Sequence, residues 1–345
     1  MRMYSSLGTW CIALSVATLS LVVCSSASAQ QPASWDEVVT AAKAEGKVVL
    51  YSGAPGAPEQ HDVARLFEKR YGIPVELLDA NGPEIQERIR TEVASGHVTG
   101  DILNTGTTGQ ALMIQRGLVI PYGNIPNISE VVLKPSTDLE VPTFVNPYGF
   151  LINTDLIRSD EQPKSWLDLL DPKWKGKILG YNYWFQGSGA TWFGVMQDRF
   201  GTEYHEKMAK QNIHFSTTVR ENPRRVARGE FSIFVPFTIT DMGRLEGLPL
   251  KAVVPTEGLA YTPYSLTMIK EAPHPNAARL LMNFFLEPEA QLVYARNGFP
   301  IARRGMEAQI PEKWRWSVSA KLLGQQRLDG IQERMSLASR IYQGK

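Results

Sequence analysis

One order of elements recurs along this chain: a buried strand, a loop of small residues and an amphipathic helix. The apolar run 47–51 predicts a strand, a break follows at 52–56, and a helical pattern starts near Glu59. The same order returns at 74–95 and at 101–116. Strands and helices that alternate in this way predict parallel βαβ units and therefore an α/β fold. In an open α/β sheet, the loops after the strand C-termini converge on one crevice, where ligands bind.

The first 29 residues predict a secretory signal that is removed from the mature protein. Arg2 is their one charged residue, residues 10–23 are apolar, and 27–29 reads Ala-Ser-Ala, a signal-peptidase pattern. The apolar stretch is shorter than the roughly 20 residues of a membrane-spanning helix. A lipid on Cys24 is the alternative, but the valine before it fits a lipoprotein signal poorly. We therefore expect cleavage after Ala29 and a periplasmic location.

The composition of the mature protein argues against several kinds of site and partner. Its two cysteines, Cys11 and Cys24, both lie in the signal, so the mature chain has no disulfide and no thiolate metal site. The chain has 36 Lys and Arg and 35 Asp and Glu, and loss of Arg2 makes these counts equal. A net charge near zero gives no reason to expect a nucleic-acid partner. We expect no stable membrane insertion, and a chain long enough for two domains.

Two parts of the sequence predict crossings between these domains. Residues 141–144 and 148–153 form two short extended runs joined at Asn146-Pro147, and 259–269 is another extended run that can carry the chain back. The division expected from these crossings is a first lobe of 30–145 with 260–305, a second lobe of 146–259, and a C-terminal helical segment, 306–345, that packs on the lobes.

Four stretches of the sequence resemble a known protein family and keep the order found there. They are SWDEVVTAAKAEGKVVLYSG at 34–53, SWLDLLDPKWKGKI at 165–178, RGEFSIFVPF at 228–237 and PNAARLLMNFFLEPEAQ at 275–291. The chain resembles the family 1 extracellular solute-binding proteins of ABC importers. Within the type II periplasmic binding proteins, it resembles the branch with ferric-iron, thiamine and phosphonate receptors. This resemblance implies a two-lobed α/β fold with a ligand cleft and a hinge of two crossing strands.

The resemblance also implies a role and partners. Binding of a small-molecule solute closes the two lobes like a Venus flytrap, and the closed form docks on the transmembrane subunits of an ABC permease. We expect a monomer without a cofactor, acting in transport. A periplasmic sensor subunit that presents its ligand to a membrane kinase would share this fold and stays open as an alternative.

Iron receptors of this family hold Fe(III) with two adjacent tyrosines just after the strand that matches 231–235. Here that position reads Val-Pro-Phe-Thr-Ile-Thr, and Phe237 and Thr238 stand where the tyrosines would be. We therefore predict no metal site. An Fe(III) receptor remains an alternative, but the hydroxyls, amides and glycines of the loops favour a polar or anionic organic solute.

Candidate ligand-binding residues lie after the strand ends and at the crossings. Small residues there let a ligand approach backbone N–H groups, and helix N-termini bind anions. The same residues can instead serve as turns, helix caps or core. The first-lobe candidates are Ser52, Gly53, Asn81, Gly82, Thr105, Gly106 and Thr107. The second-lobe candidates are Gly187, Ser188, Gly189, Thr191, Phe237 and Thr238, and the crossings add Tyr148, Tyr261 and Tyr264.

A secreted enzyme is the main rival class. The sequence contains no Gly-x-Ser-x-Gly nucleophile elbow and no His-Glu-x-x-His zinc helix. Its five histidines are scattered singly. We expect no enzymatic activity and no catalytic residue, although a carboxylate pair among the acidic residues would leave no such signature.

Overall fold

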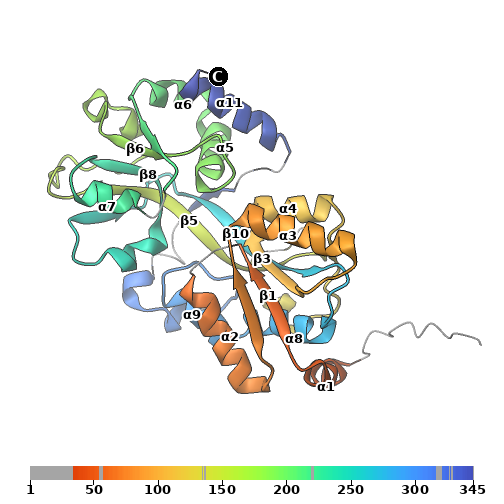
Figure 1. Cartoon of the computed structure of the whole chain (residues 1–345). Helices are drawn as coiled ribbons and strands as arrows, with labels where there is room; N and C mark the ends of the chain where they lie inside the picture. Colours follow the sequence, from red (N-terminus) through yellow and green to blue (C-terminus); the bar gives the residue numbers. More distant parts are fainter. Residues whose placement is uncertain are drawn as a thin grey trace, which may run out of the picture. The chain divides into compact units, whose positions relative to one another are not determined.

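The computed structural model describes residues 34–53, 57–133, 135, 137–218, 221–315, 321–325, 327 and 329–344. The predicted signal, 1–29, and its cleavage site lie outside these ranges. Figure 1 shows a mixed α/β fold. The strands are β1 (Val48–Ser52), β2 (Val75–Asp79), β3 (Ile102–Gly106), β4 (Val119–Ile120), β5 (Val141–Asn153), β6 (Ile178–Tyr181), β7 (His214–Ser216), β8 (Ile233–Thr238), β9 (Leu250–Val253), β10 (Leu259–Ile269) and β11 (Leu322–Gly324).

These strands join in one sheet in the order β2-β1-β3-β10-β5-β8-β6-β7, with β4 and β11 paired to β10 and β9 paired to β5. The strands β2, β1 and β3 pair in parallel, and so do β8, β6 and β7. Between these two groups, β10 and β5 pair antiparallel with each other and with their neighbours β3 and β8. Each group is a set of parallel βαβ units, as the sequence predicts, and the long strands β5 and β10 connect them.

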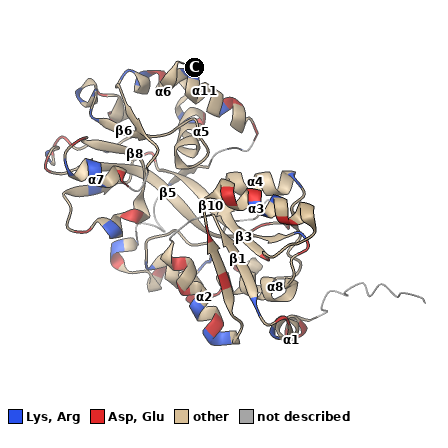
Figure 2. Cartoon of the chain, viewed as in Figure 1, with Lys and Arg blue, Asp and Glu red and all other residues tan. Residues whose placement is uncertain are grey.

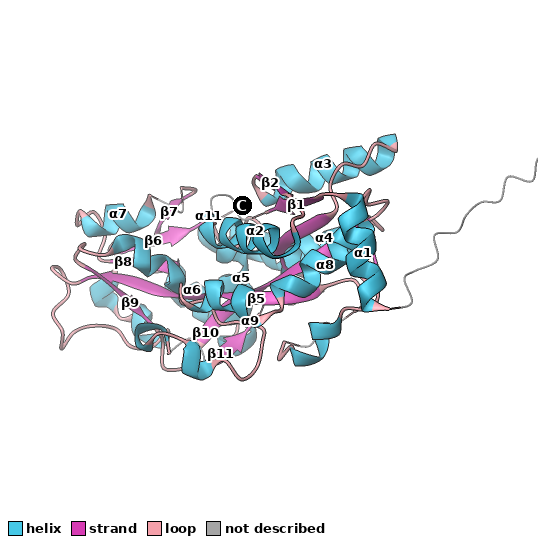
Figure 3. Cartoon of the chain, turned by 90° about the horizontal axis from the view of Figure 1, so that it is seen from below, coloured by secondary structure: helices cyan, strands magenta, loops and turns pink. Residues whose placement is uncertain are grey.

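Helices cover both faces of the sheet, as Figure 3 shows. They are α1 (Trp35–Glu45), α2 (Pro58–Tyr71), α3 (Gly82–Ser95), α4 (Thr107–Gln115), α5 (Ser188–Phe200), α6 (Thr202–Ala209), α7 (Asn222–Ala227), α8 (Pro275–Phe285), α9 (Pro288–Ala295) and α11 (Ile331–Gln343). Short 3-10 helices are η1 (Pro126–Glu130), η2 (Leu167–Leu170), η3 (Pro172–Trp174), η4 (Ile239–Leu245), η5 (Glu307–Gln309) and η6 (Glu312–Trp314). Side chains alternate between the faces: Leu50 packs with Val63 of α2, whereas Val49 packs with Ile85 of α3.

The sequence signals at the ends of α1 explain its position. The Ser34 hydroxyl accepts from the Glu37 backbone N–H, and the Glu37 carboxylate accepts from the Ser34 N–H, which together form a capping box. Gly46 ends the helix with a φ of 80°, a left-handed conformation that glycine adopts at little cost. The five buried residues of β1 follow at once, so α1 leads directly into the centre of the first parallel group.

The crossing strands differ from the prediction in one respect. Residues 141–144 and 148–153, expected as two runs, form the single strand β5, and Pro147 lies inside it, opposite Tyr261 of β10. The first half of β5 pairs with β10, and the second half pairs with β8 and β9. The predicted extended run at 259–269 is β10. The predicted break between the two runs is therefore absent, and β5 is one continuous strand with partners on both sides.

A second correction concerns the end of β3. Thr105 and Gly106 were expected in a loop but are the last residues of the strand. The cause is β10, whose Ser265 and Tyr264 pair antiparallel with them. The positions of Thr105 and Gly106 are therefore fixed by strand pairing and not by a turn.

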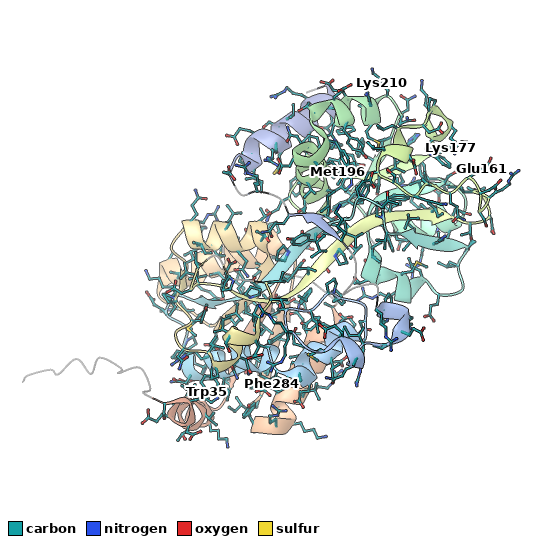
Figure 4. All side chains as sticks on the ribbon, turned by 180° about the vertical axis from the view of Figure 1, so that it is seen from behind. Trp35, Glu161, Lys177, Met196, Lys210 and Phe284 are labelled. Atoms are coloured by element: carbon teal, nitrogen blue, oxygen red, sulfur yellow. The ribbon has the colours of Figure 1, made fainter. Side chains whose placement is uncertain are left out.

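Each parallel group has hydrophobic clusters of its own. Figure 4 labels Phe284, which belongs to the cluster between α2, α8 and the first group, and Met196, which belongs to the cluster around α5. The C-terminal helix α11 packs on α5 and α6. Its Arg334 forms an ion pair of 2.9 Å with Asp198 of α5. Basic and acidic residues intermingle on the outer helices (Figure 2), in keeping with the balanced charge of the sequence.

Candidate functional site

A row of hydroxyl groups connects the two crossing strands to α5. The Tyr148 hydroxyl of β5 donates to Thr262 Oγ1 of β10 at 3.0 Å, and the Thr262 hydroxyl donates to Thr191 Oγ1 of α5 at 3.3 Å. Tyr148 is 4% exposed and Thr191 is 5% exposed. Thr262 was absent from the sequence-based candidates, because a threonine in the middle of a predicted strand gives no signal of its own.

The end of β3 reaches the same place from the other side. A Cβ atom on Gly106 would lie 2.8 Å from Thr262 Cγ2 and 3.5 Å from the Tyr264 ring, so glycine permits this close approach. Thr107 then donates from Oγ1 to the Pro263 carbonyl at 3.3 Å. We call Gly106, Tyr148, Thr191, Thr262 and Tyr264 the crossing site. Four of its five members were predicted from sequence.

Gly53 and Thr105 adjoin the crossing site on the first-lobe side. The Gly53 N–H donates to the Asn104 carbonyl at 2.8 Å, and a Cβ on Gly53 would lie 2.7 Å from Thr105 Oγ1. A Cβ on Gly109 would come equally close to Thr105, at 2.8 Å. The glycines therefore leave the Thr105 hydroxyl room that a larger residue would fill.

The glycine turn before α5 forms the second-lobe side. A Cβ on Gly187 would lie 3.9 Å from the Tyr181 hydroxyl, and Gly187 has a φ of 138°, which favours glycine. A Cβ on Gly189 would collide with the backbone carbonyl oxygens of Tyr181 and Asn182. Both glycines are thus required by the turn that brings Ser188 and Thr191 to the start of α5.

The helices that begin at this site differ from α1 in their caps. Glycine occupies the N-cap of α4 (Gly106) and of α5 (Gly187), so neither N-cap has a side chain to accept a backbone N–H. The first turn of an uncapped helix presents backbone N–H groups and the positive end of the helix dipole. Because Thr262 contacts the start of both helices, two potential anion-binding ends meet there.

Both tyrosines of the crossing site are held in the neutral form. Burial raises the pKa of Tyr148, and the neighbouring Tyr264 raises it further, against the opposing effect of the Thr262 hydrogen bond. Burial also raises the pKa of Tyr264, although the Asn146 side chain, which donates to its hydroxyl, opposes this. Neutral phenols can both donate and accept hydrogen bonds.

Other predicted residues lie in different surroundings. Ser52 is fully buried at the end of β1, opposite Asp79 and Asn104. Phe237 is 1% exposed and packs in a hydrophobic cluster beneath η4. Asn81 is exposed at the start of α3, and a Cβ on the next residue, Gly82, would lie 3.7 Å from the Gln86 amide.

Two further candidates flank the crossing site on its own strands. Thr238 is the register partner of Tyr148, so β8 brings it beside the crossing. Tyr261 precedes Thr262 on β10 and therefore points to the opposite face of the sheet.

Polar residues that the sequence did not single out lie near the start of α2. Gln60 and Asn104 are fully buried, and their side-chain amides have no hydrogen-bond partner among the described residues. Gln60 precedes Val63 and Phe67 by three and seven positions, so it lies on the face of α2 that packs on the sheet. Asn104 faces the same side, because its register partner Leu266 packs with Val63.

Glu59, next to Gln60, is 4% exposed and lies near an arginine of η4. Arg244 Nη2 of η4 is 3.9 Å from Glu59 Oε2, and Arg244 Nη1 is 3.4 Å from Asp241 Oδ1. Burial raises the pKa of Glu59, Arg244 lowers it, and Asp241 raises it again. Acids at helix starts are common, so the sequence gives no reason to single out Asp241, whereas Glu59 falls on the apolar face of its helix, four residues before Val63.

Three surface hollows are lined by other residues. One of about 220 Å³ is lined by residues such as Val145, Ile301 and Ile310. The others lie between α2 and α9 and beside β9. None of the residues that line these three hollows is a predicted site residue.

Within the described ranges, no group of three or more His, Cys, Asp and Glu side chains is placed to hold a metal ion. In the same ranges, no helix is both long and apolar enough to cross a membrane.

Residues 105–327, more than half of the chain, match the sequence model of the bacterial extracellular solute-binding proteins. The chain belongs to this family. The match includes the end of β3, the crossing strands and the start of α5, and so covers the whole crossing site. The family consists of binding proteins, as the resemblance in the sequence implies.

A relative in Salmonella typhimurium is named "Putative 2-aminoethylphosphonate-binding periplasmic protein". This solute-binding protein is 26% identical to it over 240 residues, which are 65% of this chain and 68% of the relative.

Solved structures of periplasmic binding proteins share the fold. Iron-bound HitA from Pseudomonas aeruginosa has a TM-score of 0.69 at 18% identity. The match covers 86% of this chain and 99% of the HitA chain. AfuA from Actinobacillus pleuropneumoniae, with fructose-6-phosphate bound, has a TM-score of 0.61 at 21% identity. The match covers 87% of this chain and 97% of the AfuA chain. These likenesses confirm the two-lobed type II fold with its pair of crossing strands.

Proposed function

We propose that this protein is the periplasmic solute-binding subunit of an ABC importer and that its ligand is a small organic anion held at the crossing site. The observation that carries the proposal is the position of Thr262, which lies beside Gly106, the N-cap of α4, and donates to Thr191 near the start of α5. Both helices have glycine N-caps, and free backbone N–H groups at helix N-termini bind phosphate, phosphonate and carboxylate.

The ligands named for two similar proteins carry an anionic group of this kind. The name of the Salmonella protein contains a phosphonate, and the AfuA structure holds a sugar phosphate. Phe237 and Thr238 argue against the Fe(III) site of iron receptors, because they stand where that site has its two tyrosines. We therefore favour a phosphonate or phosphate ester.

The proposed mechanism is closure of two lobes about β5 and β10. The lobes are residues 30–145 with 260–305, and 146–259, and the segment 306–345 packs on them. Contacts that the ligand makes in the closed form alone shift the balance toward closure, by an amount set by the difference in affinity between the two forms. The closed monomer then docks on the transmembrane permease, in the periplasm, after cleavage behind Ala29.

Native mass spectrometry of the purified protein, followed by calorimetry with the compound found, tests this proposal. Ser188→Trp places a bulky ring at the start of α5 and should weaken binding about tenfold or more, which is about 1.4 kcal/mol. Asp36→Trp, at the exposed start of α1, is the matched control and should bind normally. Normal binding by Ser188→Trp, or a ligand that carries no anionic group, would contradict the proposal. Ser52 is a poorer test, because a bulky residue in its buried position would disturb packing.

A further inference from the structure

Gln86 is a buried glutamine whose amide nitrogen lacks a partner. The residue lies at the start of the second turn of α3 and is 5% exposed. Its Nε2 has no hydrogen-bond partner within the part of the chain that the structure describes. Buried side-chain amides are usually hydrogen-bonded, and burial of one without a partner costs stability. Gln86 therefore has N–H donors for which the described residues supply no acceptor.

A glutamine that serves the fold has different surroundings. Gln291 in α9 is fully buried, and its Nε2 donates to the carbonyls of Thr143 and Phe285. Its Oε1 accepts from the Ala302 N–H at 2.9 Å. Both ends of this amide are thus used to join α9 to neighbouring segments, whereas the nitrogen of Gln86 joins nothing.

The free amide of Gln86 lies beside the hydroxyl of Thr105, at the end of β3. A Cβ atom on Gly109 would lie 3.0 Å from Gln86 Nε2 and 2.8 Å from Thr105 Oγ1. Both polar atoms are therefore within hydrogen-bond length of one common point, and a single oxygen atom between them can reach both. Gly109 belongs to the first turn of α4, so this pair adjoins the start of that helix.

Glycines border the pair from three different segments. Gly53 follows β1, Gly82 begins α3, and Gly109 lies in α4. A Cβ on Gly53 would lie 2.7 Å from Thr105 Oγ1, and a Cβ on Gly82 would lie 3.7 Å from Gln86 Nε2. Glycine at these positions lets a ligand approach the backbone where an alanine methyl group would stand.

We propose that Gln86 and Thr105 form a neutral subsite next to the anion site, in which Gln86 donates a hydrogen bond to an uncharged oxygen of the solute. This rests on the proposed function and deepens it, because Thr105 directly precedes Gly106 of the crossing site. A solute hydroxyl fits this pair, since its oxygen accepts from the Gln86 amide and its proton is donated to the Thr105 oxygen. Gln86 is then a residue that determines specificity.

Two pairs of probes, each differing in one hydroxyl alone, test the neutral subsite: 2-hydroxyethylphosphonate with ethylphosphonate, and 3-hydroxypropionate with propionate. Calorimetry on the wild-type protein should show tighter binding of the hydroxyl compound in at least one pair, by about fivefold, as expected for one hydrogen bond. Gln86→Met keeps the length of the side chain and should abolish that preference, with binding of the plain compound unchanged. Gln332→Met, at an exposed position of α11, is the control and should keep the preference.

Thermal unfolding without any probe shows whether Gln86 is instead a structural residue. Gln86→Met should leave the Tm unchanged or higher, because it removes a buried donor that has no acceptor. Gln291→Met should lower the Tm, because it leaves the acceptors of that amide without a donor. If Gln86→Met lowers the Tm as much as Gln291→Met and weakens both members of a pair equally, Gln86 is structural and the neutral subsite is overturned.

The remaining outcomes separate this inference from the proposed function. If both members of each pair bind equally, or if the preference survives Gln86→Met, the neutral subsite is wrong and the anion site stands. If neither phosphonate binds but 3-hydroxypropionate binds more tightly than propionate, and loses this advantage in Gln86→Met, the neutral subsite stands and the phosphonate assignment is wrong. If none of the four compounds binds, the neutral subsite is overturned, and the compound found by native mass spectrometry decides the proposed function.

Discussion

Two buried polar regions of the molecule differ in how their side chains are paired. At α6, His205 is fully buried, yet its Nε2–H donates to the Phe193 carbonyl and its Nδ1 accepts from the Tyr342 hydroxyl, both at 2.9 Å. At the start of α2 and the end of β3, Gln60 and Asn104 are equally buried, and their amides lack partners in the part of the chain that the structure describes, as does the amide of Asn222 in α7. A buried polar group without a partner costs about 1–3 kcal/mol. Paired groups therefore hold the fold together, whereas an unpaired group marks a place where water or a ligand can supply the missing partner.

The largest effect is expected in the paired region. His205 stacks on Phe193 with ring centroids 3.9 Å apart and connects α11 to α5 through Tyr342. His205→Ala should lower the free energy of unfolding by about 3 kcal/mol, because it leaves a cavity and removes two hydrogen bonds. Urea unfolding followed by circular dichroism measures this. His214→Ala, at an exposed position, should change stability little. A similar loss of stability in both variants would show that the hydrogen bonds of His205 do not stabilise the fold.

The same histidine should make stability depend on pH. Burial lowers the pKa of His205 to about 3, against an ordinary value of 6.5. Between these values the unfolded chain binds a proton that the native protein does not, so the contribution of His205 to stability falls as pH drops below about 6.5. The loss is at most about 1.4 kcal/mol per pH unit and ends near pH 3. Unfolding curves of wild type and His205→Gln from pH 7 to pH 4 should converge toward acid, and parallel curves would contradict this.

Removal of the unpaired amide of Gln60 should have the opposite effect on stability. Gln60→Leu replaces a buried amide without partners by an apolar side chain of similar size, so stability should stay the same or rise by about 1 kcal/mol. Affinity for the ligand should fall, since the amide is expected to complete its contacts. Thermal unfolding and calorimetry on the same preparation test both parts. A loss of stability with normal affinity would make Gln60 a structural residue like His205.

The smallest effect is expected at the crossing site itself. Thr191→Val removes the acceptor for the Thr262 hydroxyl and keeps the shape of the side chain. The expected loss of stability is about 0.5–1 kcal/mol, typical of one hydrogen bond. Thr202→Val, at the start of α6, provides a comparison outside the site. An increase in stability would place Thr191 with unpaired groups such as Gln60.

The sequence predicts the fold better than the site because strands and helices leave local patterns. The run 259–269 is β10 to the residue, and the capping box of α1 is visible in Ser34 and Glu37. Thr105 and Gly106 were expected in a loop, because the strand that holds them is β10, more than 150 residues further along the chain.

The same limit applies to the candidate ligand groups. Thr262 acquires its role from Thr191 and Gly106, and Glu59 lies near Arg244; these neighbours are all distant in sequence. A buried acid on the apolar face of a predicted helix, four residues before Val63, is the one local signal that could have drawn attention to Glu59.

A crystal structure with the ligand found by native mass spectrometry would show directly where the anionic group binds. We expect the anionic group within hydrogen-bond distance of backbone N–H groups in the first turns of both α4 and α5, beside Thr262. Density for the ligand in the hollow lined by Ile301 and Ile310, or on one helix start without the other, would contradict the account.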